Sequence, residues 1–431
     1  MNILMVVFHF PPLNAMASSR HYAFAKYWAK AGHHVTVVTP KKYRYHGTLN
    51  YEPEDLDLFE LIEVDFGGGV MKRFVSPRSS TGQGPALNGL RKAVRYLRKH
   101  LIGNAFDVQK VWEDAVYKQA EMLLRERAFD FLYSAFSPPV PFRIASRLKA
   151  TFPQLFWVAD YRDLWSGNHL LKTHPLLAKF QQKKEKQLLQ KADLIITVSH
   201  GFKNYLERFH DREVHVVYNG YDHEEIAHIS SQRFFPEDAT YRFVYTGTIY
   251  IGTRDPAPFF EAVRRVVREK QISSQSLQIW FFGDSGDVLE IAERTGVGEY
   301  VHTGGWITKE EAYRAQRDAD GILFLETEYE RGNLSAEGTI PAKLFENMRA
   351  GTEIFAVGIT SASFVGKLIE RSKTGKAYGT DTDAIYRRLK VLLQSQKKEA
   401  VQPNRRLIER FERSRCARRV LELVKKQKEG K

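Results

Sequence analysis

Short apolar runs alternate with stretches of helical periodicity along most of the chain. The first half contains "ILMVVF", "HVTVVT", "FDFLYSAF", "LFWVAD", "ADLIITVS" and "VHVVYNG". The second half contains "YRFVYTG", "LQIWFFGD", "YVHTGG", "DGILFLE" and "TEIFAVG". Apolar strands that alternate with helices are typical of parallel sheets covered by helices on both faces. The pattern therefore predicts an α/β protein with two doubly wound units in tandem.

The polar segment 219–240 has no strong period and predicts the join between the two units. We therefore expect one domain at 1–218 and another at 219–403. The tail at 404–431 is basic with apolar residues at intervals, which predicts a helix that packs back on the first domain. Residues 41–86 carry glycine and proline clusters and predict a long irregular insertion.

Composition narrows the setting of the protein. A chain of 431 residues with 43% hydrophobic residues is long enough for more than one core. Its single cysteine, Cys416, cannot form an internal disulfide and fits a reducing compartment. The sequence contains no run of about 18 apolar residues, so it predicts no membrane-spanning helix. The first residues lack the basic segment and the small-residue cleavage site of a signal peptide. We expect a cytoplasmic protein.

The formal charge of +14 favours an anionic partner. The stretch 87–102 places apolar residues at helical spacing among five cations: Arg91, Lys92, Arg95, Arg98 and Lys99. Such a helix either lies on an anionic membrane surface, on the inner face of the cell membrane, or packs on the core with a solvated basic face. Nucleic acid is not an expected partner, because the strands read as buried and leave no exposed sheet face.

Candidate chemistry lies after the strands, since ligands of open α/β sheets bind beyond the carboxyl ends of the strands. No GxGxxG follows the first strand, which disfavours a nicotinamide dinucleotide. In the second unit glycines gather in these turns, and the stretch "EGTIPAKLFENMRAG" predicts a helix that begins near Pro341. The helix start and Lys343 suit a phosphate, Arg254 can add a second charge, and Glu346 can accept hydrogen bonds from a ribose. The motif alone equally fits an ordinary helix cap with a surface lysine and glutamate.

Three longer stretches resemble the GT-B retaining glycosyltransferases of family 4, which include bacterial polysaccharide and lipid-linked glycan enzymes. They are the opening segment 1–40, the segment 192–222 before the join, and "GTIPAKLFENMRAG". The resemblance covers nearly the whole chain. It implies two Rossmann-like domains that face each other across a cleft, with no cofactor. The implied reaction moves a sugar from a nucleotide-sugar, most often a UDP-sugar, to a glycan or lipid-linked acceptor with retention of configuration.

The resemblance also implies site residues. On the donor side these are Gly247, Thr248, Arg254, Gly283, Glu337, Gly338, Thr339, Ile340, Lys343 and Glu346. On the acceptor side they are Asn14, Ser18, Arg20 and Arg162. The chain departs from the family at Gly338, where relatives often have the first of two glutamates, and the neighbouring Glu337 is the available substitute.

The loop "WVADYRDLWSG" supplies the carboxylates Asp160 and Asp163 as candidate catalytic residues, with Arg162 to position one of them. A carboxylate there can orient a sugar hydroxyl or stabilise positive charge at the anomeric carbon. The alternative is a structural ion pair that closes the strand end. We expect no metal, because the sequences "DAD" at 318–320 and "DTD" at 381–383 read as strand and helix caps.

Two other functions remain open on the sequence. Nucleotide-sugar epimerases that hydrolyse UDP-N-acetylhexosamines share the two-domain fold and need no acceptor. A non-catalytic relative of the glycosyltransferases is the second alternative, because Gly338 departs from the family pattern.

Overall fold

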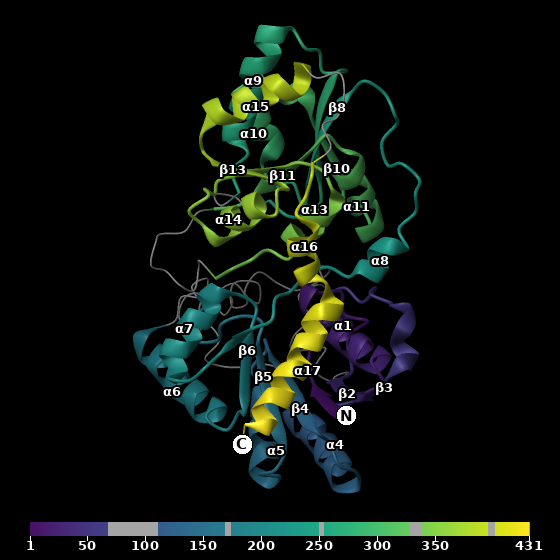
Figure 1. Cartoon of the computed structure of the whole chain (residues 1–431), viewed down its shortest axis with the longest axis vertical. Helices are drawn as coiled ribbons and strands as arrows, with labels where there is room; N and C mark the ends of the chain where they lie inside the picture. The colour runs from purple at the N-terminus through teal and green to yellow at the C-terminus, as the bar shows by residue number, and fades with distance from the viewer. Residues whose placement is uncertain (68–110, 169–173, 250–253, 328–337, 395–400, 431) are drawn as a thin grey trace, which may run out of the picture. The chain divides into compact units, whose positions relative to one another are not determined.

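The computed structural model describes residues 1–67, 111–168, 174–249, 254–327, 338–394 and 401–430 (Figure 1). These residues form two compact units. Among the described residues, unit 1 contains 1–219, 338–339 and 413–430, and unit 2 contains 220–327 and 340–412. The predicted boundary between 218 and 219 lies beside this division. The segment 404–431, predicted as one helix, contains two helices separated by a 3₁₀ turn, and only its part from Arg413 onward belongs to unit 1. The sequence 87–102 lies outside the described residues.

Unit 1 is built on a parallel sheet with the strand order β3-β2-β1-β4-β5-β6-β7. The strands are β1 (Asn2–Val6), β2 (His34–Pro40), β3 (Glu60–Val64), β4 (Phe131–Phe136), β5 (Phe156–Tyr161), β6 (Leu194–Thr197) and β7 (His215–Val216). The helices are α1 (Met16–Lys30), α4 (Glu113–Glu126), α5 (Val140–Thr151), α6 (Pro175–Leu189), α7 (His200–His210) and α17 (Arg413–Glu429), with 3₁₀ turns η1 (Arg44–His46) and η2 (Glu54–Leu58).

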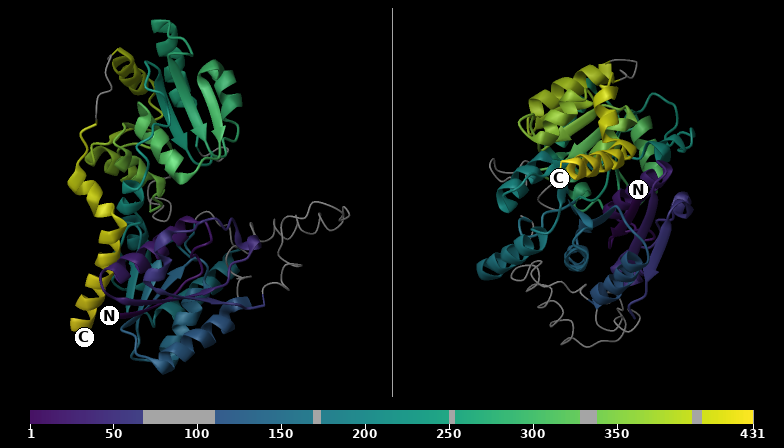
Figure 2. Two further views of the ribbon diagram at one scale, coloured as in Figure 1. Left: turned by 90° about the vertical axis from the view of Figure 1, so that its right-hand side faces the viewer. Right: turned by 60° about the horizontal axis from the view of Figure 1, so that its bottom comes forward.

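The central strand of unit 1 is apolar on both faces because each face is covered. Leu4 and Val6 join the core on one side of the sheet, while Ile3 and Met5 join the core on the other. The second core includes α17, which lies along α1 (Figures 1 and 2). Trp28 of α1 donates its indole N–H to the carbonyl of Ala417 at 2.8 Å. The end of the chain thus completes the unit in which the chain begins.

Unit 2 has a second parallel sheet with the order β10-β9-β8-β11-β12-β13. Its strands are β8 (Tyr241–Thr246), β9 (Leu277–Phe282), β10 (Val301–Gly305), β11 (Gly321–Leu325), β12 (Ile354–Val357) and β13 (Gly375–Gly379). Its helices are α8 (His223–Ala227), α9 (Ala257–Lys270), α10 (Val288–Thr295), α11 (Lys309–Asp318), α13 (Lys343–Ala350), α14 (Phe364–Arg371), α15 (Thr382–Gln394) and α16 (Arg405–Ile408), with η5 (Gly298–Tyr300) and η6 (Glu409–Phe411). The two sheets confirm the predicted α/β class.

Two edge strands are absent from the sequence prediction. β3 (Glu60–Val64) lies within the segment predicted to be irregular, and β13 (Gly375–Gly379) follows the last predicted strand. An edge strand needs few buried residues, so its sequence lacks a long apolar run. Residues 60–64 include two glutamates and 375–379 include two glycines, which explains why the pattern missed them.

Each sheet has a point where the strand order reverses. In unit 1 it lies between β1 and β4, and in unit 2 between β8 and β11. At such a point, the chain segments that follow two neighbouring strands run to opposite sides of the sheet. A crevice therefore opens beyond the carboxyl ends of these strands, and ligands of open α/β sheets bind there. These two switch points locate the candidate sites.

Candidate active site

The turns after β8 and β9 bring two glycines together at the switch point of unit 2. Gly247 has a positive φ of 126° and Gly283 one of 111°. A Cβ atom on Gly283 would lie 2.5 Å from the carbonyl oxygen of Gly247. Only glycine allows this approach, so the two predicted donor-side glycines let the turns after β8 and β9 contact each other.

Lys343 begins α13 and reaches this turn. Its Nζ lies 4.0 Å from the centre of the Tyr245 ring and 3.5 Å from the carbonyl oxygen of Thr246. Among the described residues no carboxylate forms an ion pair with it. Burial, with a smaller contribution from the charge of Arg254, lowers the pKa of Lys343 to about 7, and Glu326 opposes the shift. A half-buried ammonium that forms no ion pair among the described residues is a strong candidate for binding an anion.

Arg254 spans the switch point from the β8 side. It donates to the carbonyl of Thr248 at 2.8 Å and forms a 3.3 Å ion pair with Glu326, which directly follows β11. The Arg254 side chain is largely buried, so its charge is fixed near Lys343. The arrangement places two cations and one carboxylate at the mouth of the crevice.

Glu346 lies one turn after Lys343 on α13. Its Oε1 is 3.6 Å from Nζ of Lys309, at the start of α11, and Lys309 also contacts Glu225. The Glu346 side chain is 22% exposed, so it is accessible to a ligand. The helix begins two residues after the predicted Pro341, whose carbonyl accepts a hydrogen bond from the amide of Leu344 at 3.0 Å.

The segment before α13 contains the departure from the family pattern. Glu337 lies outside the described residues. A Cβ atom on Gly338 would lie 2.2 Å from a ring carbon of Phe202 and 2.6 Å from the Phe202 backbone nitrogen, so the structure leaves no room for a side chain there. Thr339 is half-buried and Ile340 is buried.

Asp160 of unit 1 is fully buried within β5. Its carboxylate accepts hydrogen bonds from Arg20, at 2.9 and 3.3 Å, and from the hydroxyl of Tyr133. Arg20 also donates to the carbonyls of Val217 and Tyr218. This arrangement favours the structural ion pair that the sequence left as an alternative. A role for Asp160 on a donor sugar stays a prediction.

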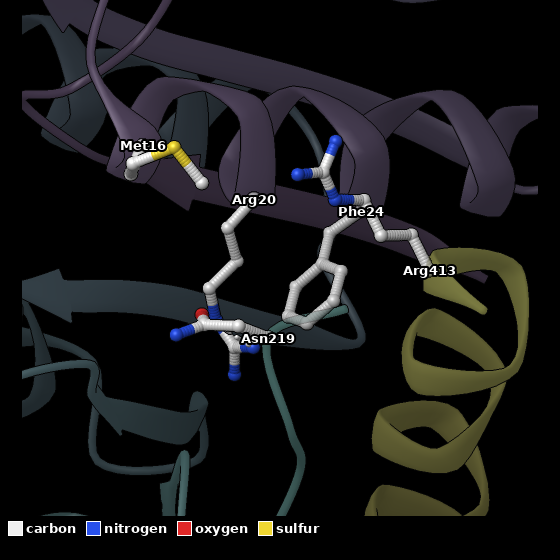
Figure 3. Close-up of a pocket in the computed structure, with 5 residues that line it drawn as sticks. All are labelled: Met16, Arg20, Phe24, Asn219 and Arg413. Carbon is white, nitrogen blue, oxygen red and sulfur yellow. Dashed lines mark hydrogen bonds between the residues drawn. The ribbon is translucent and has the colours of Figure 1, made fainter. Parts of the chain in front are cut away.

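The Arg20 side chain borders a small cavity of about 10 Å³, room for about one water molecule. It is lined by Met16, Arg20, Phe24, Asn219 and Arg413 (Figure 3). The guanidinium of Arg20 stands 4.6 Å from the centre of the Phe24 ring. The cavity belongs to the packing of α1 against α17 and is too small for a substrate.

Asp163 and Arg162 follow β5 and contact each other. The Asp163 side chain is 41% exposed and that of Arg162 is 20% exposed. Asp163 is therefore the accessible carboxylate of the predicted pair. The charge of Arg162 also acts on His9. Burial is the main cause that lowers the pKa of His9, and Arg162 adds to this shift.

The remaining acceptor-side residues lie apart from these charges. Asn14 is exposed and donates to the side chain of Asn50 at 2.8 Å. Ser18 is fully buried, and its hydroxyl has no hydrogen-bond partner among the described residues. A contact between Ser18 and the acceptor stays a prediction.

Sequence reasoning missed two residues at the switch point of unit 1. His9 donates from Nδ1 to the carbonyl of Ser137 at 2.9 Å, which joins the ends of β1 and β4. Lys42, two residues after β2, is 7% exposed. Their position just beyond strand ends was the available signal, but Lys42 lies within the segment predicted to be irregular.

The aspartates of the two predicted caps hold local structure. Asp318 accepts from the amide of Phe234 at 2.6 Å, and Asp320 accepts from the amide of Arg242 at 2.8 Å. Asp381 accepts from the amide of Ala384, and Asp383 pairs with Arg265. The described part of the chain contains no group of three metal-ligating side chains, and none of its helices is both long and apolar enough to cross a membrane.

Comparison with known proteins finds a family match over part of the chain and similar folds among solved structures. Residues 18–225, which lie almost entirely in unit 1, match Glycosyltransferase Family 4. The comparison with curated proteins finds no match. Among solved structures, the chain is similar to sucrose-phosphate synthase from Thermosynechococcus elongatus, with a TM-score of 0.61, 15% identity and full coverage of both chains.

Two further structures share the fold. A glycosyltransferase from Rickettsia africae aligns with a TM-score of 0.58 and 13% identity over 99% of this chain and 98% of that chain. The N-terminal domain of trehalose-6-phosphate phosphatase from Candida albicans aligns with a TM-score of 0.59 and 11% identity over 99% and 97%. At these identities the likeness shows the fold alone. Together with the family match, it confirms the predicted resemblance.

Proposed function

We propose that this protein transfers a sugar from a nucleotide-sugar to a glycan or lipid-linked acceptor, because residues 18–225 match Glycosyltransferase Family 4 and the chain has a GT-B fold. The proposed donor is a UDP-sugar and the proposed outcome is retention of anomeric configuration, both on the resemblance of the sequence to that family. The proposed setting is the synthesis of cell-surface polysaccharide or glycoconjugate.

One observation carries the donor side of the proposal. Lys343 and Arg254 lie at the switch point of unit 2, and the described residues supply Lys343 with no carboxylate partner. A diphosphate would provide the missing negative charge. Glu346, three residues after Lys343, is the proposed acceptor of hydrogen bonds from the ribose. Gly247, Thr248 and Gly283 supply the close backbone turn.

The leaving diphosphate needs positive charge as the glycosidic bond breaks. We propose that Lys343 and Arg254 provide it, so that the reaction requires no divalent metal. Of the two candidate carboxylates, the more accessible Asp163 is the proposed group that acts on the donor sugar, with Arg162 as its positioning residue. Asp160 holds Arg20.

Membrane attachment belongs to the same proposal. An acceptor with a lipid anchor lies at a bilayer, and the basic stretch 87–102 would bring the enzyme to the cytoplasmic face through electrostatic attraction to anionic lipid. This stretch lies outside the described residues, so its proposed role rests on the sequence.

The test is a binding and turnover panel. Calorimetry with UDP, GDP and ADP identifies the nucleotide, and incubation with UDP-sugars alone separates the alternatives. A transferase leaves the donor sugar unchanged without an acceptor, whereas an epimerase isomerises it. A protein that binds none of the nucleotides would contradict the proposed donor site. Binding without turnover of any supplied acceptor would favour a non-catalytic relative.

A further inference from the structure

We infer that the carboxyl edge of the unit 1 sheet binds an oxyanion on the acceptor, a phosphate or a carboxylate, through Lys42 and Arg162 beside the ring of Phe8. The inference rests on the proposed function, since it names the chemical class of acceptor for that transfer. Both groups carry a compact negative charge, and the experiment below separates them.

Topology brings the residues together. The strand order in unit 1 reverses between β1 and β4, and the hydrogen bond from His9 to the carbonyl of Ser137 crosses that point. Lys42 follows β2, the neighbour of β1 on one side. Arg162 follows β5, the neighbour of β4 on the other side. The two cations therefore flank the crevice in which ligands of such sheets bind.

Lys42 is a buried cation without a carboxylate in ion-pair range among the described residues. Its Nζ donates to the hydroxyl of Thr39 at 2.7 Å and to the carbonyl of Pro40 at 2.5 Å. Both acceptors are neutral. Burial lowers the pKa of Lys42 to about 7, and the charge of Glu63 opposes the shift. An ammonium held away from water with only neutral acceptors gains from a bound anion.

Arg162 has an N–H donor available for a ligand. It pairs with Asp163 through Nη2, while its buried Nε has no hydrogen-bond partner among the described residues. The neighbouring His21 is 1% exposed, donates from Nδ1 to the carbonyl of His9 at 2.7 Å, and leaves its buried Nε2 without a partner in the same described set. Buried polar atoms are rarely left unmatched unless a ligand or water completes them.

The imidazoles around the cations are neutral at physiological pH. Burial lowers the pKa of His9 to about 3 and that of His46 to about 4, and Lys42 contributes to both shifts. Neither imidazole therefore adds a positive charge beside the two cations. In the part of the chain that the structure describes, Asp163 pairs with Arg162 and Glu63 acts on Lys42.

Aromatic rings lie beside the ammonium of Lys42. The Phe8 ring lies 5.3 Å from Nζ of Lys42, 5.2 Å from the His46 ring and 5.7 Å from the Trp112 ring, on which it stacks. The rings of Tyr43 and Tyr45 stack at 5.5 Å. Apolar and aromatic walls with a few convergent polar groups are typical of small-molecule sites. Phe8 and Trp112 are buried in the core of unit 1 and support Lys42 from within, whereas the half-buried Tyr43 and Tyr45 offer the ring surface for a sugar that carries the charged group.

The test uses calorimetry with glucose 6-phosphate, glucuronic acid and uncharged glucose as probes. We expect the wild type to bind at least one charged probe and Lys42→Met to lose at least tenfold in affinity for it. Arg162→Gln should lose affinity for the same probe. Lys41→Met is the matched control, because the adjacent Lys41 side chain is 52% exposed, and it should stay within twofold of wild type. Preference for the phosphate or the uronic acid identifies the anion.

Equal affinity in wild type and Lys42→Met, or an equal loss in Lys41→Met, would overturn the inference. If Lys42→Met fails to fold, judged by circular dichroism, Arg162→Gln carries the test alone, and unchanged affinity in it is decisive. UDP binding is measured on the same proteins. Loss of the acceptor-anion site leaves UDP binding intact, whereas a protein that binds the charged probe and no nucleotide contradicts the proposed function instead.

Discussion

The ammonium of Lys343 lies over the face of the Tyr245 ring, 4.0 Å from its centre. A second ring, that of Phe324, lies 5.5 Å from the same nitrogen. Tyr245 and Phe324 belong to β8 and β11, the strands on either side of the switch point in unit 2. Cation–π attraction offsets only part of the free-energy cost of removing the ammonium of Lys343 from water. A negatively charged ligand at this place would offset more of that cost.

The first prediction is that Lys343→Met weakens UDP binding. Loss of a charge-assisted hydrogen bond to the diphosphate should cost at least about 1 kcal/mol, roughly a fivefold rise in Kd by calorimetry. The melting temperature should not fall, because the change removes a buried charge. Lys367→Ala, at an exposed lysine of α14, should bind as the wild type does. Unchanged affinity in Lys343→Met would remove Lys343 from the site.

The second prediction concerns pH. Because the pKa of Lys343 is lowered to about 7, UDP affinity should be flat just below pH 7 and decline above it, by up to about tenfold per pH unit. Lys343→Met should lack this decline between pH 7 and 9. A wild-type affinity that is constant over that range would show that the charge of Lys343 does not contact the nucleotide.

Stability should move in the opposite direction. The pKa of Lys343 in the folded chain lies below its ordinary value, so between about pH 7 and 10.5 the unfolded chain binds the proton that the folded chain has lost. The cost of burying Lys343 is therefore fully present below pH 7 and is relieved as pH rises. The advantage in melting temperature of Lys343→Met over wild type should shrink from pH 6 to pH 9.

The third prediction concerns Glu346. If it accepts hydrogen bonds from the ribose, Glu346→Gln should weaken UDP binding by roughly 1 kcal/mol while inorganic diphosphate, which lacks a ribose, binds as before. Glu290→Gln, at an exposed glutamate of α10, is the control. Equal losses of affinity for UDP and for diphosphate would mean that Glu346 acts through Lys309 and the surrounding charges and not through the ribose.

The fourth prediction separates the two candidate carboxylates of unit 1. Asp163→Asn should cut kcat with little change in UDP affinity, because the nucleotide is proposed to bind unit 2. Asp160→Asn should instead lower stability, by about 3–5 kcal/mol if the buried charge of Arg20 is left uncompensated. Normal stability with lost turnover in Asp160→Asn would restore Asp160 as the group that acts on the sugar.

Asp160 and Lys42 show what the sequence could and could not predict. The apolar runs predicted the central strands, and the position after a strand marked the Asp-Arg-Asp stretch. However, Asp160 pairs in register with Ala135 and Ile196 inside the sheet. Its partner Arg20 is 140 residues away in the sequence, and no local pattern reveals that contact. In the sequence, Lys42 resembles a surface lysine like its neighbour Lys41. Its burial becomes apparent only when β1 and β2 are paired in the sheet.

The fifth prediction is that the proposed transfer continues in EDTA. Lys343 and Arg254 supply the positive charge that a divalent metal supplies in other transferases, since both lie at the switch point where the diphosphate is proposed to bind. Turnover should therefore be unchanged after chelation, and added magnesium or manganese should not raise it. A strict requirement for either ion would overturn the metal-independent reaction.

The last prediction is that the protein binds anionic vesicles through a basic surface. Changing Arg95, Arg98 and Lys99 to glutamate should release it from anionic vesicles in sedimentation, with binding to neutral vesicles absent throughout. Helix α6 is the other candidate, because Leu176 and Phe180 are 72% and 61% exposed at helical spacing.

The matched variant for α6 changes Lys179, Lys183 and Lys186 to glutamate, since these lysines share the exposed side of α6 with Leu176 and Phe180. Release by this variant alone assigns attachment to α6, and release by the 87–102 variant alone assigns it to that stretch. If both variants still pellet with anionic vesicles, or the wild type does not pellet at all, the proposed attachment is wrong. Melting temperatures within a few degrees of wild type exclude unfolding as the cause of release.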